Sequence, residues 1–369
     1  RCVQLNSALE CLKTPTGLNV GKCALARLET LITAPETEGV EWGQVKFCLF
    51  VRLTTKDGLY DWGEAFVLPY REKAVAEIIH ALGRSASKLK SISPWTFRDL
   101  AKQAATRHQS LEFSAAGSAL EMALWDILGK LLNARLCDLL GGNHNRAIPI
   151  YGNIWNTTQW DVASLETRAT DLVAEGYRAI KLHPMLNHTA QDAANCVNQV
   201  RAAIGGDIAL MVDLDSQNNA DAAIQIAQAI EPAHPYWFEK PIDGSDIRAL
   251  AQIRKDQALR VVTGEKHCGL AHFRAVLVAG AADILNPDIA AVGGILDLLD
   301  IAELADQQRV QISPHCWNSM TVAAAAMLHV CASIPNAEMA EIYPEYIQHG
   351  EKFAFTAFLL EGEYAHLSN

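Results

Sequence analysis

The chain has 369 residues, half of them hydrophobic, and a formal net charge of −11 at pH 7. A chain of this length and composition can bury a substantial core, so we expect a globular protein of one large domain or two smaller ones. The excess of acidic residues leaves no strongly basic surface for the phosphate backbone of a nucleic acid, which argues against nucleic-acid binding. No run reaches the roughly 18 apolar residues of a membrane span, so we expect no membrane segment.

The N-terminus and the cysteines bear on the cellular compartment. Nine cysteines form no Cys-x-x-Cys pair, and most lie in apolar segments. This pattern is typical of buried thiols in a reducing environment, and we expect a cytoplasmic protein. Residues 1–23 show weak periodicity and lack the order of a signal peptide, and we expect them to form an extension outside the fold.

Residues 24–146 are predicted to form an α+β domain. Residues 44–65 contain two apolar segments around a Lys-Asp-Gly turn, which is typical of a β-hairpin. Helical patterns follow and end in the segment 118–142, whose final double glycine suits a helix stop.

Residues 147–344 alternate short apolar strands with amphipathic helices. Each predicted strand is nearly continuous in apolar residues up to a polar tip, as expected when both faces are buried. The strands are predicted at 147–154, 179–185, 208–215, 235–242, 259–267, 283–290, 310–318 and 337–344. We therefore predict an α/β fold with a closed (β/α)7β barrel of the TIM type. An open doubly wound sheet is the alternative, but no glycine-rich fingerprint follows the first strand. We expect residues 345–369 to pack back on the N-terminal domain.

Two bases lie two positions apart in the strand predicted at 179–185. Side chains at i and i+2 of a strand point to the same side, so Lys181 and His183 project together. Taken alone, the pair can be a lysine that extends to water beside a hydrogen-bonded core histidine. The rest of the barrel must decide between this explanation and a catalytic one.

Polar residues lie near the ends of the later strands, about one strand and helix apart: Asp213, Glu239, Glu265, Asp288, His315 and Glu341. The carboxyl ends of barrel strands converge on one mouth, where active sites lie, so these side chains are expected to meet Lys181 and His183. Three of the carboxylates, Asp213, Glu239 and Glu265, would repel one another there unless a cation or protons neutralised them. Such a set favours Mg²⁺, and no Cys/His cluster suggests zinc. The alternative is three unrelated ion pairs.

An ordered set of short motifs runs through this region: KLH, VDLD, FEKP, GEKH, NPD, SPH and AEIYP, with GLYDWGEA and ALWDILGK upstream. Together they resemble the enolase superfamily, in its mandelate racemase/muconate lactonizing enzyme branch, over about residues 24–344. The resemblance implies that the N-terminal domain caps the barrel mouth and that Asp213, Glu239 and Glu265 bind Mg²⁺.

The same resemblance implies roles for the remaining residues. Asp288 and His315 match the Asp–His dyad of the mandelate racemase-type subgroup, and Glu341 matches the carboxyl group that hydrogen-bonds the substrate carboxylate. Lys181 and His183 occupy a Lys-x-Lys position, where the second residue is usually a base. This chain departs from the pattern at His183, although an imidazole can also act as a base near neutral pH.

The resemblance also implies a reaction, Mg²⁺-dependent abstraction of the proton α to a carboxylate through an enediolate. We expect β-elimination of water from a sugar acid to give a 2-keto-3-deoxy acid, as in acid-sugar dehydratases. A racemase, epimerase or cycloisomerase that uses the same intermediate is the alternative, and a non-catalytic metal-binding barrel is a remote one. The expected partners are a small-molecule carboxylate and further copies of the chain in a homo-oligomer.

Several loops are candidates for substrate contact. They are residues 34–43, Phe66–Tyr70 with Arg71, Trp155 and Asn156 after the first barrel strand, and Trp317 and Asn318 after His315. Ordinary surface loops are the alternative. The Val-Gly-Gly-Ile sequence at 292–295 suits either an anion site at a helix start or a tight turn. His267 is a weaker candidate for a supporting role.

Overall fold

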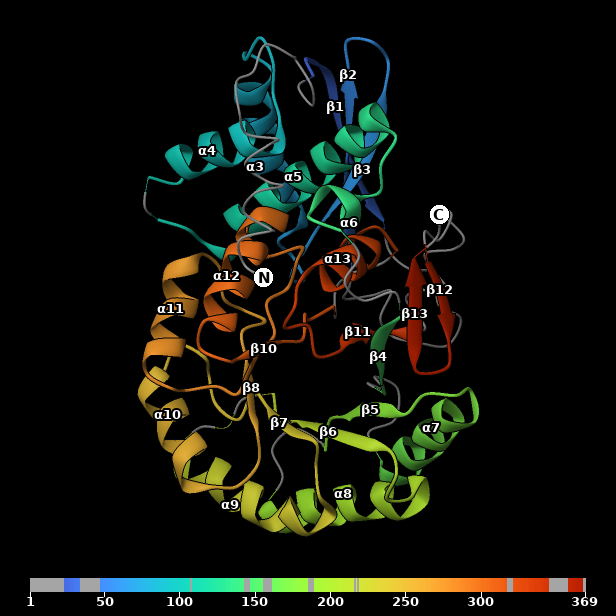
Figure 1. The fold of residues 1–369 in the computed structure, drawn as a ribbon. Helices are drawn as coiled ribbons and strands as arrows, with labels where there is room; N and C mark the ends of the chain where they lie inside the picture. The colour runs from blue at the N-terminus through green and yellow to red at the C-terminus, as the bar shows by residue number, and fades with distance from the viewer. Residues whose placement is uncertain are drawn as a thin grey trace.

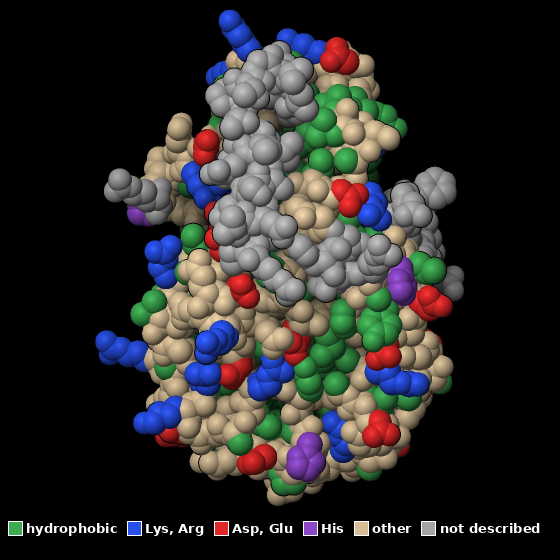
Figure 2. Space-filling view, viewed as in Figure 1, with side chains coloured by type: hydrophobic (Ala, Val, Ile, Leu, Met, Phe, Trp, Pro, Cys, Tyr) green, Lys and Arg blue, Asp and Glu red, His purple; other side chains and the backbone are tan. Residues whose placement is uncertain are grey.

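The computed structural model describes residues 23–33, 47–106, 108–142, 147–154, 161–184, 189–215, 217, 219–316, 321–344 and 358–367. A smaller N-terminal domain lies against one end of a larger barrel (Figure 1). Acidic and basic side chains are interspersed on the face shown in Figure 2. Within the described ranges, no helix combines the length and the apolar character needed to cross a bilayer.

The N-terminal domain contains a three-stranded antiparallel sheet in the order β1 (Leu25–Thr33), β2 (Cys48–Thr55) and β3 (Tyr60–Ala65). The β2–β3 hairpin confirms the turn predicted from Lys-Asp-Gly, and Gly58 has a φ of +87° there, which a glycine adopts without strain. Cys23 forms a β-bridge with Ile92, so this residue belongs to the fold and not to the expected extension; residues 1–22 lie outside the described ranges.

The described part of this domain also contains four helices: α3 (Glu72–Ala86), α4 (Pro94–Ala104), α5 (Leu111–Leu132) and α6 (Leu136–Leu139). The long helix α5 is largely buried and crosses the sheet so closely that a Cβ at Gly63 would lie 1.8 Å from the Ala119 carbonyl oxygen. The double glycine does end a helix, because the N–H of Gly142 donates to the carbonyl of Cys137 and closes the short helix α6, but it does not end the long helix. The long helix ends at Leu132 because Asn133 adopts a left-handed conformation, and Gly141 and Gly142 follow the short helix α6.

The barrel strands are β4 (Ile148–Asn153), β5 (Ala179–Leu182), β6 (Ala209–Asp213), β7 (Trp237–Glu239), β8 (Val261–Thr263), β9 (Ile284–Leu285), β10 (Gln311–Ile312) and β11 (Ala340–Ile342). They pair in parallel in chain order from β4 to β10. The barrel closes because β11 pairs with β4 and Ile312 of β10 bridges Ala337. This closed, parallel arrangement confirms the predicted (β/α)7β barrel.

Helices alternate with these strands around the outside of the barrel (Figure 1). They are α7 (Val162–Ala174), α8 (Ala190–Ile204), α9 (Ala220–Ile230), α10 (Ile247–Asp256), α11 (Leu270–Val278), α12 (Ile295–Asp306) and α13 (Thr321–Ser333). A short 3-10 helix, η1 (Glu231–Ala233), follows α9. Inside the barrel, alternate strand residues fill the space, and Tyr151 packs edge-on against Trp237 with ring centroids 5.1 Å apart. This packed interior forms the floor beneath the barrel mouth.

The end of the described chain is a hairpin of β12 (Phe358–Glu361) and β13 (Tyr364–Leu367). Of the segment 345–369, which we expected to pack on the N-terminal domain, only residues 358–367 are described, and in this part β13 pairs antiparallel with the first residues of β4 in the barrel. The physical reason is the register of β11, which pairs with Ile150–Gly152 and leaves the beginning of the same edge of β4 open to another strand.

Candidate active site

The strand ends bring all eight predicted site residues into one buried region at the barrel mouth. None of their side chains is more than 9% exposed. A cavity of about 180 Å³ lies among them, and Phe66 and Leu68 of the N-terminal domain line it from the other side. The remaining lining residues are Asn153, Lys181, His183, Asp213, Asp215, Lys240, Glu265, Lys266 and His315.

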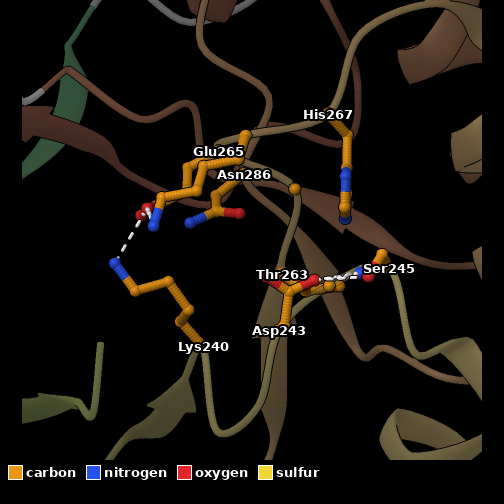
Figure 3. A pocket seen from close by; sticks show the side chains of 10 residues that line it. Lys240, Asp243, Ser245, Thr263, Glu265, His267 and Asn286 are labelled. Carbon is orange, nitrogen blue, oxygen red and sulfur yellow. Dashed lines mark hydrogen bonds and ion pairs between the residues drawn. The ribbon is translucent and has the colours of Figure 1, made fainter. Parts of the chain in front are cut away.

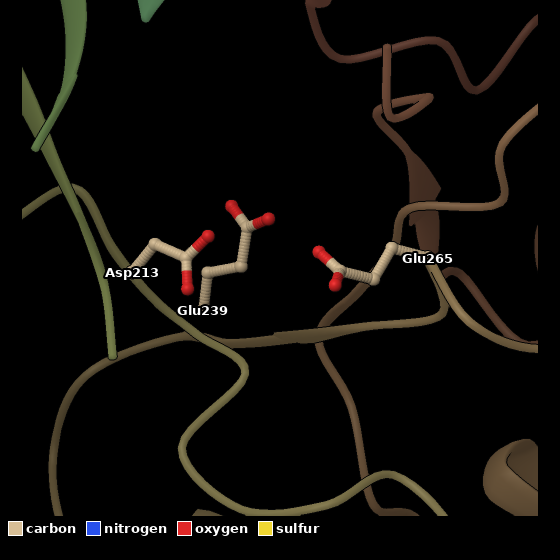
Figure 4. A group of neighbouring side chains, drawn as sticks. All are labelled: Asp213, Glu239 and Glu265. Atoms are coloured by element: carbon tan, nitrogen blue, oxygen red, sulfur yellow. The ribbon is translucent and has the colours of Figure 1, made fainter. Parts of the chain in front are cut away.

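Three carboxylates converge from consecutive strands. Asp213 and Glu239 are direct neighbours in the β6–β7 register, and Glu265 follows β8 by one turn residue, Gly264. One oxygen from each of the three side chains lies within 4.8 Å of the others (Figure 4). Such an all-oxygen donor set suits a hard divalent cation, so these residues fit the Mg²⁺ that the sequence predicts.

The ammonium group of Lys181 is buried among three carboxylates. Its Nζ lies 2.9 Å from Glu239 Oε1, 2.7 Å from Glu341 Oε1 and 3.8 Å from Asp213 Oδ2. Burial would lower the pKa of Lys181, but Glu239 and Glu341 outweigh burial and raise the pKa well above its usual value. The lysine is therefore a fixed cation, and the snorkelling that explains many strand-end lysines does not apply.

Glu341 is the middle residue of β11 and accepts hydrogen bonds on both oxygens. Asn153 donates to Oε1 from 2.8 Å, and the backbone N–H of Cys316 donates to Oε2 from 2.9 Å. Burial raises the pKa of Glu341, but Lys181 and His315 outweigh burial and lower it. Glu341 is thus a charged acceptor in this arrangement, and hydrogen-bond donation from it to a substrate stays a prediction.

The two histidines contact opposite members of the carboxylate set. His183 directly follows β5, and its Nε2 lies 3.6 Å from Asp213 Oδ2. His315 follows β10, and its Nε2 lies 3.5 Å from Glu265 Oε2 while its Nδ1 lies 2.8 Å from Asp288 Oδ2. The two imidazoles are therefore separated by the site at which a cation would bind.

The surroundings give the two imidazoles different proton affinities. Burial lowers the pKa of His183 to about 4, and Lys181 and Lys240 act in the same direction. Burial also acts to lower the pKa of His315, but Glu265 and the bond to Asp288 outweigh it and raise the pKa to about 9. One imidazole is neutral and the other is cationic at neutral pH.

Sequence reasoning missed a second buried lysine. The Nζ of Lys240 lies 2.8 Å from Glu265 Oε1, 2.5 Å from Asp215 Oδ1 and 4.0 Å from Asp213 Oδ1. Lys240 and Asp215 both have positive φ, at 46° and 52°, a backbone conformation that is strained for these residues and is frequent at functional sites. The available signal was their position close behind two metal-ligand candidates: Lys240 directly follows Glu239 in FEKP, and Asp215 lies two positions after Asp213 in VDLD.

Two asparagines were also missed. Asn153 donates to Glu341, as described above, and the side-chain amide of Asn286 donates to Glu239 Oε1 from 2.9 Å. Both side chains are buried, and each orients a carboxylate of the site. Asn286 is the first residue of the motif NPD, two positions before Asp288.

A second cavity of about 210 Å³ lies beyond the Lys240–Glu265 ion pair (Figure 3). His267 lines it and stacks on His272, with ring centroids 3.7 Å apart. A Cβ at Gly244 would lie 2.3 Å from His267 Nε2, so glycine is required for this close approach. His267 is therefore placed beside the main cavity and not in it.

The predicted substrate loops have mixed outcomes. Phe66 and Leu68 line the main cavity, whereas Tyr70 is 90% exposed and Arg71 pairs with Glu112 on the surface. Residues 34–43, Trp155, Asn156, Trp317 and Asn318 lie outside the described ranges. At 292–295, Gly293 and Gly294 both have positive φ before α12, and the helix start that follows is occupied by the carboxyl group of Glu121 from the N-terminal domain.

Comparison with known families gives two matches that together span most of the chain. Residues 31–141 match the mandelate racemase / muconate lactonizing enzyme N-terminal domain, and residues 164–369 match the enolase C-terminal domain-like family. The two matched segments correspond to the capping domain and the barrel.

Individual relatives include enzymes that act on sugar acids. The chain is 29% identical over 310 residues to a D-gluconate dehydratase of Thermoproteus tenax; the alignment covers 81% of this chain but only 61% of that relative. It is 28% identical over 292 residues to a D-galactarolactone cycloisomerase of Agrobacterium fabrum, covering 78% of this chain and 76% of the relative.

A solved structure shares the whole architecture. It is described as an enolase from the environmental genome shotgun sequencing of the Sargasso Sea, and it superposes with a TM-score of 0.90 at 38% identity. The superposition covers 94% of this chain and 92% of the other.

Proposed function

Because the chain belongs to the mandelate racemase/muconate lactonizing enzyme branch of the enolase superfamily, we propose that it is an acid-sugar dehydratase. It takes the proton α to the carboxylate of a sugar acid and eliminates water from the β-position, which gives a 2-keto-3-deoxy acid. The observation that carries the proposal is the placement of two imidazoles, His183 and His315, on either side of a buried carboxylate triad in one cavity.

Asp213, Glu239 and Glu265 would hold the Mg²⁺. When bound, Mg²⁺ supplies a Lewis acid that stabilises the negative charge developing on the substrate carboxylate. Lys181 adds a permanent positive charge on the same side, because three carboxylates hold its ammonium in place. Phe66 and Leu68 close the cavity with apolar surface and so reduce the access of water.

The two histidines divide the proton transfers. We assign His183 as the base, because its imidazole lies beside Asp213 of the triad and burial lowers its pKa to about 4, which leaves it neutral and able to accept a proton. His315 is the acid, since Asp288 holds its Nδ1–H and leaves Nε2 directed toward the triad. As the α-proton moves to His183, the electrons of the C–H bond form the enediolate. The β-hydroxyl then leaves as water with the proton from His315, and the resulting enol becomes the 2-keto acid.

Screening sugar acids for 2-keto acid formation in the presence of Mg²⁺ tests this function. Incubation of active substrates in D₂O then separates the two steps. His315→Asn should make no product but should still exchange the α-proton for deuterium, whereas His183→Asn should do neither. Product formation at the wild-type rate by both variants would refute the assignment.

A racemase or epimerase is the second candidate, and the same paired imidazoles favour it. Proton transfer from one face and return from the other would invert the α-carbon without loss of water. The screen distinguishes the two, because an epimerase would give a stereoisomer of equal mass and no 2-keto acid.

A further inference from the structure

Two glutamates of the capping domain are buried where that domain contacts the barrel. Glu121 lies on α5 and Glu64 lies on β3, and neither is exposed to solvent. Glu121 Oε1 accepts the backbone N–H of Leu296 from 2.8 Å, in the first turn of α12. Glu64 Oε2 accepts the backbone N–H of Ala323 from 3.0 Å, in the first turn of α13. Each carboxyl group therefore binds the start of one barrel helix.

These two helices follow the strand ends that carry the dyad. Asp288 lies between β9 and α12, and His315 lies between β10 and α13. We propose that Glu121 and Glu64 are positioning residues that keep Asp288 and His315 in register through the helices that follow them. The proposal rests on the proposed function, in which the dyad transfers a proton, and it gives the capping domain a part in that step besides covering the cavity.

On the Asp288 side, a series of hydrogen bonds connects the capping domain to the Asp288 carboxyl group. Ser118, one turn before Glu121 on α5, accepts the N–H of Gly293 from 3.0 Å. Phe66 donates its N–H to the carbonyl of Ala290 from 3.0 Å. The N–H of Ala290 in turn donates to Asp288 Oδ1 from 2.8 Å. The segment that carries Asp288 is thus held from the capping domain at three points.

The glycine directly before α12 is explained by the same contact. Gly294 has a φ of +120°, and a Cβ there would lie 2.3 Å from Glu121 Oε2. A side chain at this position would therefore push Glu121 away from α12. Figure 1 shows α5 and α12 side by side at the boundary of the two domains.

The geometry favours positioning over simple packing. Glu121 also accepts the indole N–H of the buried Trp125 from 3.1 Å on the same oxygen, Oε1, so the carboxyl group is fixed from its own helix as well. A carboxyl group at a helix N-terminus interacts favourably with the unpaired N–H groups there. A small displacement of α12 would be transmitted to Asp288, and misplacement of a catalytic group by about 1 Å can lower a rate by roughly 100-fold.

The test compares Glu121→Leu with Glu121→Gln in the full chain. Leucine removes the acceptor for the Leu296 N–H, whereas glutamine keeps one acceptor oxygen at nearly the same position and is the matched control. Glu64→Leu and Glu64→Gln form the equivalent pair on the α13 side. Ser118→Ala is a milder variant that removes only the bond to Gly293.

The first readout needs no substrate. It is the NMR signal of the His315 Nδ1–H hydrogen-bonded to Asp288, assigned by its disappearance in His315→Asn, together with amide exchange at Gly293 and Leu296. We expect Glu121→Leu and Ser118→Ala to shift or broaden the Nδ1–H signal and to speed exchange at both amides. Glu121→Gln should resemble wild type. Glu64→Leu should disturb the Nδ1–H signal without speeding exchange at Gly293.

The second readout is the division between kcat and KM on the substrate found by screening. Glu121→Leu and Glu64→Leu should lower kcat by roughly 10- to 100-fold and leave KM within about twofold, because the residues touch no substrate. A folded Glu121→Leu protein with a wild-type Nδ1–H signal overturns the proposal, as does equal damage by Gln and Leu. If Glu121→Leu does not fold, the Nδ1–H signal of the Ser118→Ala protein provides the test instead, and a wild-type signal there overturns the proposal. If no sugar acid is turned over, the proposed function fails, while the NMR and exchange results still decide the positioning role.

Discussion

His315 and Asp288 are joined twice, by a 2.8 Å hydrogen bond between Nδ1 and Oδ2 and by a bridge between their backbones. Asp288 is fully buried, and its other oxygen accepts the N–H of Ala290. The aspartate therefore has its orientation fixed before any substrate binds, and it fixes the imidazole in turn.

This relationship predicts non-additive kinetics. His315→Asn and Asp288→Asn should each lower kcat by about 100-fold or more, because each change destroys the same proton-transfer unit. The double variant should be little slower than the slower single variant. Steady-state kinetics on all three proteins checks this, and losses that multiply in the double variant would show that the two side chains act separately.

The carboxylate triad predicts metal binding that depends on each member. Asp213→Asn, Glu239→Gln and Glu265→Gln keep the side-chain size but remove one charged ligand, and each should weaken Mg²⁺ binding by about 100-fold or more. Isothermal titration calorimetry measures the affinity, and circular dichroism confirms the fold. Asp243→Asn is the matched control, because Asp243 lines the neighbouring cavity and bonds to Ser245 instead. Wild-type affinity in a triad variant would contradict the assignment.

Removing the charge of Lys240 is expected to change the Mg²⁺ affinity in the opposite direction to the triad variants. Its ammonium lies 2.8 Å from Glu265 Oε1 and is only 11% exposed, so it opposes the binding of a second cation. Lys240→Met should tighten Mg²⁺ binding, on the order of tenfold, and should lower the Tm of the protein in chelator because the carboxylates lose a counter-charge.

A neighbouring lysine provides the control for this change. Lys266 lies 3.9 Å from the same carboxylate atom, but its side chain is 53% exposed and its charge is screened by solvent. Lys266→Met should therefore change affinity and Tm little. Weaker Mg²⁺ binding in Lys240→Met would instead show that the ammonium supports the metal site.

Glu121 predicts a pH dependence of stability. Burial, with a smaller contribution from Asp297 on α12, raises its pKa from 4.5 to about 8, although the hydrogen bond from the Leu296 N–H and Arg98 oppose this shift. Arg98 and Lys102 on α4 face the same region and pair with Asp297. The folded protein holds the Glu121 proton more tightly than the unfolded chain does. The contribution of Glu121 to stability is therefore complete at low pH and is lost as the pH rises from about 4.5 through about 8.

Glu121→Gln has no proton to lose and should remove this slope, which is at most about 1.4 kcal/mol per pH unit. Urea unfolding at several values between about pH 5 and pH 8 measures the difference in unfolding free energy between the two proteins. The difference should move in favour of Glu121→Gln as the pH rises. Parallel pH curves for the two proteins would mean that Glu121 is already ionised in the folded chain throughout this range.

Much of the barrel and its site could be predicted because their signals are local and repeated. A strand buried on both faces is a short apolar run, and its last residues face the barrel mouth, so the regular spacing of Asp213, Glu239 and Glu265 carries information about their convergence. His183 and His315 followed from the same logic. Their contacts with Asp213 and Glu265 depend on side-chain geometry, which cannot be deduced from the spacing of residues along the sequence.

Other features depend on backbone conformation or on distant partners. The sequence shows a lysine after Glu239, but its side chain enters the site only with the positive φ that Lys240 adopts. The long helix α5 ends because a single residue, Asn133, adopts a left-handed conformation, whereas the more obvious double glycine comes later in the sequence. Glu121 lies in an apolar helical segment whose partner, Leu296, is 175 positions away, so no local pattern indicates the contact.

The pairing of β13 with β4 has a consequence for how the chain folds during synthesis. The strand β4 is made early in the barrel, yet part of its edge is paired only by Tyr364 and Ala365, near the end of the described chain. Such distant pairing slows folding, and until it forms the start of β4 presents unpaired backbone groups to other chains. Ribosome-bound chains that lack these last residues should therefore depend on chaperones more than released ones do.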